Sequence, residues 1–100
     1  MRLYEDDAVS MPPGAPALAG KRAIRADLAR FLAANQVYET ASVKDVMVSG
    51  ALAVERAEYR AELRPTRGRP TVERGKHVVV YRLGRDGRWR VRWEIWNAGQ

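Results

Sequence analysis

The segment from Arg88 to Asn97 alternates between two kinds of side chain. Successive side chains of a strand point to opposite faces of a sheet, so the alternation predicts a strand with two different faces. One face is a wholly apolar row, made of Trp89, Val91, Trp93 and Ile95. The other face is a charged row that ends in an indole, made of Arg90, Arg92, Glu94 and Trp96. If the charged row faces water, this is an ordinary half-buried strand. If it faces a cavity, it supplies a binding site with an acid and two cations.

The rest of the chain predicts one helix and three further strands. Apolar residues recur at helical spacing within residues 21–35, at Ile24, Leu28, Phe31 and Leu32. The strand pattern then covers residues 38–48, 51–63, 72–83 and 88–97. Near the N-terminus, Leu3 and Tyr4 are interpreted as the end of a helix, followed by a short extended piece. This order predicts one α+β domain over residues 1–100, with a curved antiparallel sheet packed on helices.

Composition excludes several kinds of site. The chain has no cysteine and one histidine, so disulfides, thiolate chemistry and a structural zinc site are excluded. No phosphate-binding glycine motif is present, and we expect no cofactor and no metal. No apolar run approaches the roughly 20 residues that span a bilayer. Acidic residues stand near the N-terminus where a signal peptide needs an apolar stretch, so we expect a cytoplasmic protein without a membrane partner.

The net charge of +6 raises nucleic acid as a partner. Twelve of the 18 basic residues lie between positions 56 and 92, spread along three strand segments and their turns. They form no compact helix or tail, and aromatic side chains are not interleaved on the same face. A solvated basic face is the simpler interpretation, and nucleic-acid binding is not favoured.

Four segments of the chain resemble a known family, the SnoaL-like branch of the nuclear transport factor 2-like superfamily. They occur in the family's order and cover nearly the whole chain: Leu3 to Gly14, Gly20 to Arg25, Gly75 to Arg82, and Asp86 to Asn97. The resemblance implies a cone-shaped sheet of the cystatin-like roll type, wrapped around helices, with a pocket at the open end. Family members normally begin with a long helix across the concave face, and this chain starts where that helix ends. Either this start is internal to a longer protein, or the protein lacks that helix. In the second case the concave face is uncovered, which would favour self-association as a homodimer or a larger homo-oligomer.

By resemblance to the ketosteroid isomerases, the charged row faces the pocket. The pocket lining then consists of Met11, Phe31, Glu55, Tyr59, His77, Val79, Tyr81, Arg90, Arg92, Glu94 and Trp96. The row of Trp89, Val91, Trp93 and Ile95 would lie on the convex side as an interface between subunits. Without the resemblance, the opposite orientation is the simpler interpretation: the apolar row packs against the helix and the charges face water.

Glu94 is the candidate catalytic residue, because polyketide cyclases of this superfamily use an acidic residue at a comparable strand position. Nearby cations favour the charged form of a carboxyl group, which suits a general base; desolvation would suit a general acid. The alternative is an arginine–glutamate cluster that only orients the pocket wall. His77 is a second acid/base candidate, or a strand histidine bonded to a neighbour.

Three functions remain open from the sequence. The first is binding of a small, mostly apolar and anionic molecule, with acid/base chemistry of the cyclase, isomerase or hydrolase kind. The aspartate that ketosteroid isomerases use is absent near Pro12, and an epoxide hydrolase arrangement would need Glu55 and Glu94 around Arg92. The second function is a non-catalytic association module, as in the kinase association domains of this superfamily. The third is nucleic-acid binding.

Overall fold

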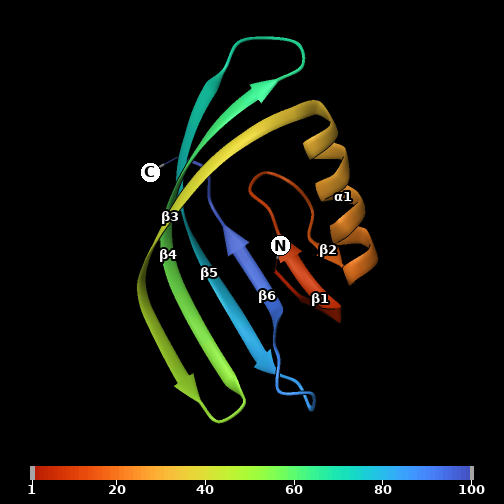
Figure 1. Cartoon of the computed structure of the whole chain (residues 1–100), viewed down its shortest axis with the longest axis vertical. Coiled ribbons are helices and arrows are strands. Elements are labelled where there is room, and N and C mark those ends of the chain that lie inside the picture. The colour runs from red at the N-terminus through yellow and green to blue at the C-terminus, as the bar shows by residue number, and fades with distance from the viewer. Residues whose placement is uncertain (1, 100) are drawn as a thin grey trace.

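The computed structural model describes residues 2–99, which form six strands and one helix (Figure 1). In chain order these are β1 (Tyr4–Met11), β2 (Leu18–Ala19), α1 (Lys21–Ala34), β3 (Asn35–Ser49), β4 (Leu52–Pro65), β5 (Thr71–Leu83) and β6 (Trp89–Trp96). The strands make one sheet in the order β2-β1-β6-β5-β4-β3. The pairing is antiparallel throughout except between β1 and β6, which run parallel.

The sheet is curved and unclosed (Figure 1). Helix α1 contacts β2 and β1 at one edge of the sheet and β3 at the other edge. The α+β class with a curved sheet is therefore confirmed. The helix follows Gly20, whose φ of 94° favours glycine. It buries Ile24 and ends at Ala34, and the side-chain amide of the next residue, Asn35, donates a hydrogen bond to the Phe31 carbonyl. The chain turns directly into β3 there, three residues earlier than the pattern predicts.

The concave face of the sheet is hollow because its buried side chains are small. Along β4 this face carries alanines at every fourth position, with Glu55 and Tyr59 between them. The buried apolar residues of the described chain are Ala8, Ile24, Ala53, Ala57, Ala61, Val79 and Val91. Short side chains beneath a curved sheet leave room that larger ones would fill. The same composition that limits the core therefore creates space for a pocket.

A β-bulge in β6 breaks the predicted alternation. Val80 lies opposite Trp93, but the next residue, Tyr81, lies opposite Val91, so Arg92 has no partner on β5. An extra residue shifts the following side chains to the other face of the sheet. As a result, Glu94 and Trp96 share the concave face with Val91 and Trp89. The prediction that each row keeps to one face is therefore wrong, because the rows exchange faces at Arg92.

We expect Gly75→Ala to destabilise the fold by about 1–3 kcal/mol, as overpacked sites do. Gly75 is buried, and a Cβ atom there would lie 2.8 Å from the Tyr59 ring and would also collide with the Asn97 carbonyl oxygen. Chemical denaturation of the variant measures the loss. The neighbouring exposed Arg74→Ala should change the unfolding free energy little, and equal stability of the two variants would contradict the prediction.

Candidate functional site

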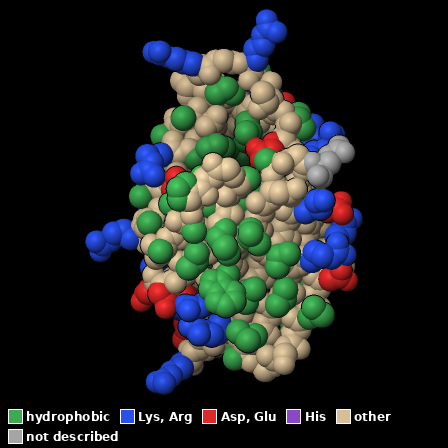
Figure 2. Space-filling view, turned by 180° about the vertical axis from the view of Figure 1, so that it is seen from behind, with side chains coloured by type: hydrophobic (Ala, Val, Ile, Leu, Met, Phe, Trp, Pro, Cys, Tyr) green, Lys and Arg blue, Asp and Glu red, His purple; other side chains and the backbone are tan. Residues whose placement is uncertain are grey.

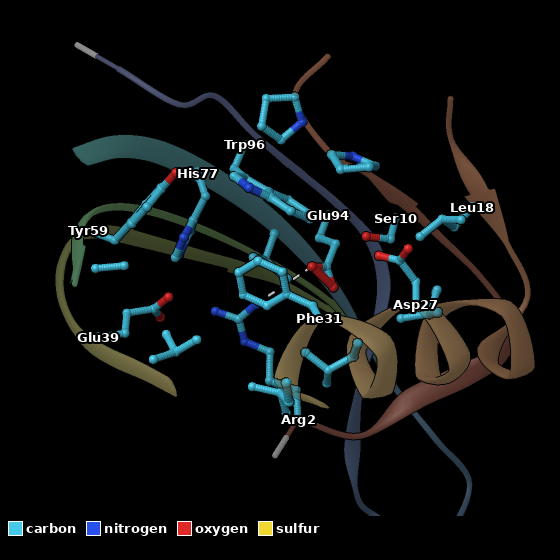
Figure 3. A pocket seen from close by; sticks show the side chains of 18 of the residues that line it. Arg2, Ser10, Leu18, Asp27, Phe31, Glu39, Tyr59, His77, Glu94 and Trp96 are labelled. Atoms are coloured by element: carbon cyan, nitrogen blue, oxygen red, sulfur yellow. Dashed lines mark ion pairs between the residues drawn. The ribbon is translucent and has the colours of Figure 1, made fainter. Parts of the chain in front are cut away.

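A pocket of about 470 Å³ lies between α1 and the concave face of the sheet (Figure 3). One wall comes from α1 and is mainly apolar, with Ile24, Leu28 and Phe31 beside Asp27. The opposite wall comes from the sheet and carries most of the polar groups. These include Tyr59 on β4, Glu73 and His77 on β5, and Glu94 beside Trp96 on β6. The volume is in the range of pockets that take small organic molecules.

Glu94 is the buried charged residue of this pocket. Its side chain is 9% exposed, and its Oε1 atom has no hydrogen-bond partner among the described residues. Its Oε2 atom lies 4.0 Å from Nη1 of Arg2, at the outer limit of an ion pair. Tyr4 of β1 stands beside it, and burial, together with the nearby carboxylate, raises the pKa of the Tyr4 hydroxyl. An orphaned buried acceptor on a pocket wall is free to receive a proton or a hydrogen bond from a ligand.

His77 lies across the pocket from α1 and is held by neighbouring strands. Its Nε2 atom is 3.8 Å from Oε2 of Glu55, and its ring stacks on Tyr59 with centroids 6.2 Å apart. The Tyr81 hydroxyl donates a 3.1 Å hydrogen bond to the same Glu55 oxygen. Burial lowers the pKa of His77, with a further lowering by Arg2, although nearby carboxylates oppose the shift. The imidazole is therefore biased toward its neutral form, which can donate or accept one proton.

Tyr59 supplies a second phenol to the pocket. Its hydroxyl lies 3.0 Å from Oε1 of Glu73 and 2.9 Å from the Asn97 carbonyl oxygen, and its one proton can serve either acceptor. Burial and the Glu73 carboxylate raise the pKa of this hydroxyl. Tyr4 and Tyr59 therefore keep their protons near neutral pH and act as donors.

The structure places Arg90 and Arg92 outside the pocket, which corrects their predicted position. Arg90 makes two hydrogen bonds to Asp86, at 2.8 and 2.6 Å. Arg92 pairs with Asp7 at 2.7 Å and with Glu5 at 3.8 Å. The cause is the bulge at Arg92, together with the acidic residues of β1 that run beside β6. With Arg92 outside the pocket, the two carboxylates around an arginine that an epoxide hydrolase needs are not present there. The expectation of an anionic ligand, which rested on Arg90 and Arg92, also loses its basis.

The remaining predicted pocket residues fall into two groups. The pocket lining includes Phe31, Tyr59, His77, Val79, Glu94 and Trp96. The other three, Met11, Glu55 and Tyr81, are half-buried and do not line it. Glu55 and Tyr81 lie farther along the same face of the sheet, where Glu55 lies near His77 and accepts a hydrogen bond from the Tyr81 hydroxyl.

Sequence reasoning missed the contribution of the N-terminal segment. Arg2, Tyr4 and Ser10 line the pocket, because β1 begins at Tyr4 and is not the end of a helix there. The available signal was the alternation within β1, which places Tyr4 on one face and Glu5 on the other. The charged pocket residues Asp27, Glu39 and Glu73 were also missed.

The predicted interface row is only partly on the convex side. Trp93 and Ile95 are 47% and 49% exposed there, whereas Val91 is fully buried. Trp89 lies opposite Leu83, on the same side of the sheet as the Tyr81–Val91 pair. The prediction that Val91 and Trp89 lie on the convex side is therefore wrong. The bulge at Arg92 places both residues on the concave face.

Residues 2–99 were searched for a group that could hold a metal ion and for a helix that could span a membrane. No group of three or more histidine, cysteine, aspartate or glutamate side chains is arranged there to hold a metal ion. Among the same residues, no helix has the length and apolar character needed to cross a membrane.

Acidification should destabilise the protein through His77, the only histidine of the chain. The folded state disfavours the protonated imidazole, so the unfolded chain binds more protons below the ordinary pKa of 6.5, and stability falls as pH falls. Denaturant titrations at about pH 7.5 and about pH 5.5 measure this, and His77→Gln should shrink the difference. Basic partners lower the pKa of three aspartates below the ordinary value of 3.8, namely Asp6, Asp7 and Asp86. These groups therefore do not titrate between pH 5.5 and pH 7.5. An unchanged pH dependence in the variant would contradict the assignment.

Comparisons with known proteins agree with this fold. Residues 1–92 match the family model of the SnoaL-like domain. No curated protein matches the sequence. A ketosteroid isomerase-like protein from Erwinia carotovora atroseptica has a TM-score of 0.88 at 21% identity, covering 97% of this chain and 76% of that one.

Two further structures are similar to the chain. A conserved protein from Planctomyces limnophilus has a TM-score of 0.90 at 18% identity, with coverage of 97% and 76%. A nuclear transport factor 2-like superfamily protein from Salmonella enterica has a TM-score of 0.82 at 14% identity, covering 98% of this chain and 73% of that one. At these low identities the structures show a shared fold and nothing finer. Together with the family match, they establish that the chain belongs to the SnoaL-like domain family, with the nuclear transport factor 2-like fold.

Proposed function

We propose that the pocket binds a small, mostly apolar molecule and that Glu94 moves a proton to or from it. The observation that carries this proposal is the buried Glu94 carboxylate, with one oxygen unpartnered, on the wall of an apolar pocket. Such a group costs stability, because a buried acceptor loses its bonds to water. A ligand that supplies a hydrogen or a proton would remove that cost.

The walls around Glu94 favour an apolar ring compound. In Figure 3, Phe31 of α1 lies close to the Glu94 carboxylate, and Trp96 stands beside it on β6. Ile24 and Leu28 of α1 also line the pocket. Flat aromatic and branched aliphatic groups gain contact with a ring without specific hydrogen bonds. The polar groups at the opposite wall would then fix the orientation of the ring.

The geometry supports proton abstraction next to a carbonyl group. In this reaction the C–H bond breaks, the proton goes to Glu94, and the electron pair moves through carbon to the carbonyl oxygen. The developing oxyanion needs a hydrogen-bond donor. Tyr4 and neutral His77 line the pocket and retain protons that can be donated, whereas the Tyr59 proton is already held by Glu73 or by the Asn97 carbonyl. One carboxylate base and neutral donors are the groups that such enolisation needs.

We expect the protein to accelerate exchange of the α-protons of tetralone, an uncharged aromatic ring ketone, in deuterated buffer. Glu94→Gln should lower the protein-dependent rate by about a hundredfold, because an amide cannot take the proton. Proton NMR follows the loss of the α-proton signal.

Glu58→Gln is the matched control, because Glu58 is exposed and outside this pocket yet changes the charge identically. It should exchange at the wild-type rate. Wild-type activity in Glu94→Gln, or no exchange and no binding with the intact protein, would contradict the proposal.

The alternative function is a homo-oligomeric association module, and an exposed patch on the convex face favours it. The convex patch runs across four strands and consists of Met47, Val54, Val78, Val80, Trp93 and Ile95. Met47 is 70% exposed. Figure 2 shows hydrophobic side chains gathered over the middle of the sheet, with acidic and basic groups at the margins. A patch of this kind is typical of a protein interface.

If the convex patch joins two copies, Trp93→Ala should convert a dimer to a monomer, because buried tryptophans dominate interface energies. Light scattering coupled to size-exclusion chromatography measures the mass. Tyr38→Ala removes another exposed aromatic residue of the sheet, outside the patch, and should leave the mass unchanged. A wild-type chain that stays monomeric at high concentration would contradict the association module.

A further inference from the structure

The charges of the pocket restrict its ligand, an inference that rests on the proposed binding function. We infer that the ligand is uncharged or cationic, and that the group it turns toward Glu94 is a proton donor: the acidic C–H of the proposed reaction, or an N–H or O–H group in a ligand that binds without reacting. A ligand carrying a carboxylate is disfavoured. This reverses the expectation that followed from placing Arg90 and Arg92 in the pocket.

The first argument is the balance of charge. Four carboxylates line the pocket, from Asp27, Glu39, Glu73 and Glu94. Among the described lining residues, Arg2 is the only arginine or lysine. Asp27 is paired with Arg30 on the same helix, and Glu73 accepts from Tyr59. Glu39 makes no ion pair with a described residue, and Glu94 has Arg2 only at 4.0 Å, so the polar side of the pocket is electronegative.

The second argument is the state of Glu94, which is independent of the other carboxylates. Its side chain is nine-tenths buried, and it points into the pocket in Figure 3. Arg2 is 38% exposed and lies 4.0 Å from the other carboxylate oxygen. Oε1 therefore remains an acceptor without a donor. Hydrogen bonds to a charged, partly desolvated group are among the stronger ones in proteins, so a ligand donor placed there gains affinity.

A ligand carboxylate would meet the opposite situation. Two like charges a few ångströms apart repel strongly where water is partly excluded. Arg2 alone would have to compensate both the ligand and Glu94. His77 cannot help as a cation near neutral pH, because burial and Arg2 lower its pKa despite Glu39, Glu55 and Glu94.

Three tetralin probes that differ only in the polar group at one ring carbon test the inference. They are the alcohol, the amine and the carboxylate, titrated into the full chain by isothermal calorimetry at neutral pH. The alcohol and the amine should each bind about tenfold or more tightly than the carboxylate. In Glu94→Gln the gap should shrink to about threefold or less, because the amide can donate to a carboxylate and the repulsion is gone.

Two further variants keep the test decisive. Glu58→Gln makes the same charge change on an exposed site outside the pocket and should leave the order of affinities unchanged. Glu39→Gln removes a second, exposed carboxylate from the pocket lining. It should also reduce the difference in affinity between the carboxylate probe and the other two probes, so the test still works if Glu94→Gln folds poorly.

The outcomes separate this inference from the function on which it rests. Equal or tighter binding of the carboxylate by the wild-type protein would overturn the inference and leave small-molecule binding supported. Absence of binding by all three probes would overturn the proposed function and the inference together.

Discussion

The bulge at Arg92 decides which chemical groups this sheet presents on each face. Without the extra residue, Glu94 would share a face with Arg92 and Arg90, and the pocket wall would hold a compensated ion cluster. With it, both arginines turn to the acidic residues of β1 and of the β5–β6 turn. Glu94 is left beside Tyr4 and Trp96, with Arg2 as its nearest cation at 4.0 Å. The separation of this carboxylate from its sequence neighbours is what makes the pocket reactive in the proposed function.

Small side chains on the concave face are the second condition for the pocket. Ala57 and Ala61 are buried beneath the sheet's curve, and larger residues there would fill the space next to Tyr59 and His77. The same choice leaves few large buried side chains: within residues 2–99, the largest that are fully enclosed are Val79 and Val91. Part of the possible stabilisation by packing is therefore absent where ligand space exists. Ligand binding would restore some of that contact, which couples binding to stability.

Much of the fold could be predicted from the sequence, because hydrophobic period and turn residues report local structure directly. The helix near Ile24, the strands and the concave position of Glu94 all follow from patterns and from the family resemblance. The positions of Arg90, Arg92 and Val91 could not be predicted in this way. A bulge adds a residue without changing the alternation of the sequence, so the pattern continues although the faces exchange. Arg2 and Tyr4 were missed because a short charged segment gives little signal of a strand that pairs in parallel with a distant one.

The charge balance of the pocket also constrains how the proposed proton transfer would run. An enolate formed beside several carboxylates gains little from Arg2, which is half-exposed and already shared with Glu94. The donors available to the oxygen are instead neutral: Tyr4, whose pKa is raised, and His77, whose lowered pKa keeps the imidazole neutral. Transfer of a proton from either group would leave a phenolate or an imidazolate among the carboxylates, so these groups stabilise the oxyanion by hydrogen bonds and keep their protons. The intermediate of the proposed reaction is therefore a hydrogen-bonded enolate, and an uncharged substrate is the one from which an electronegative pocket forms it most readily.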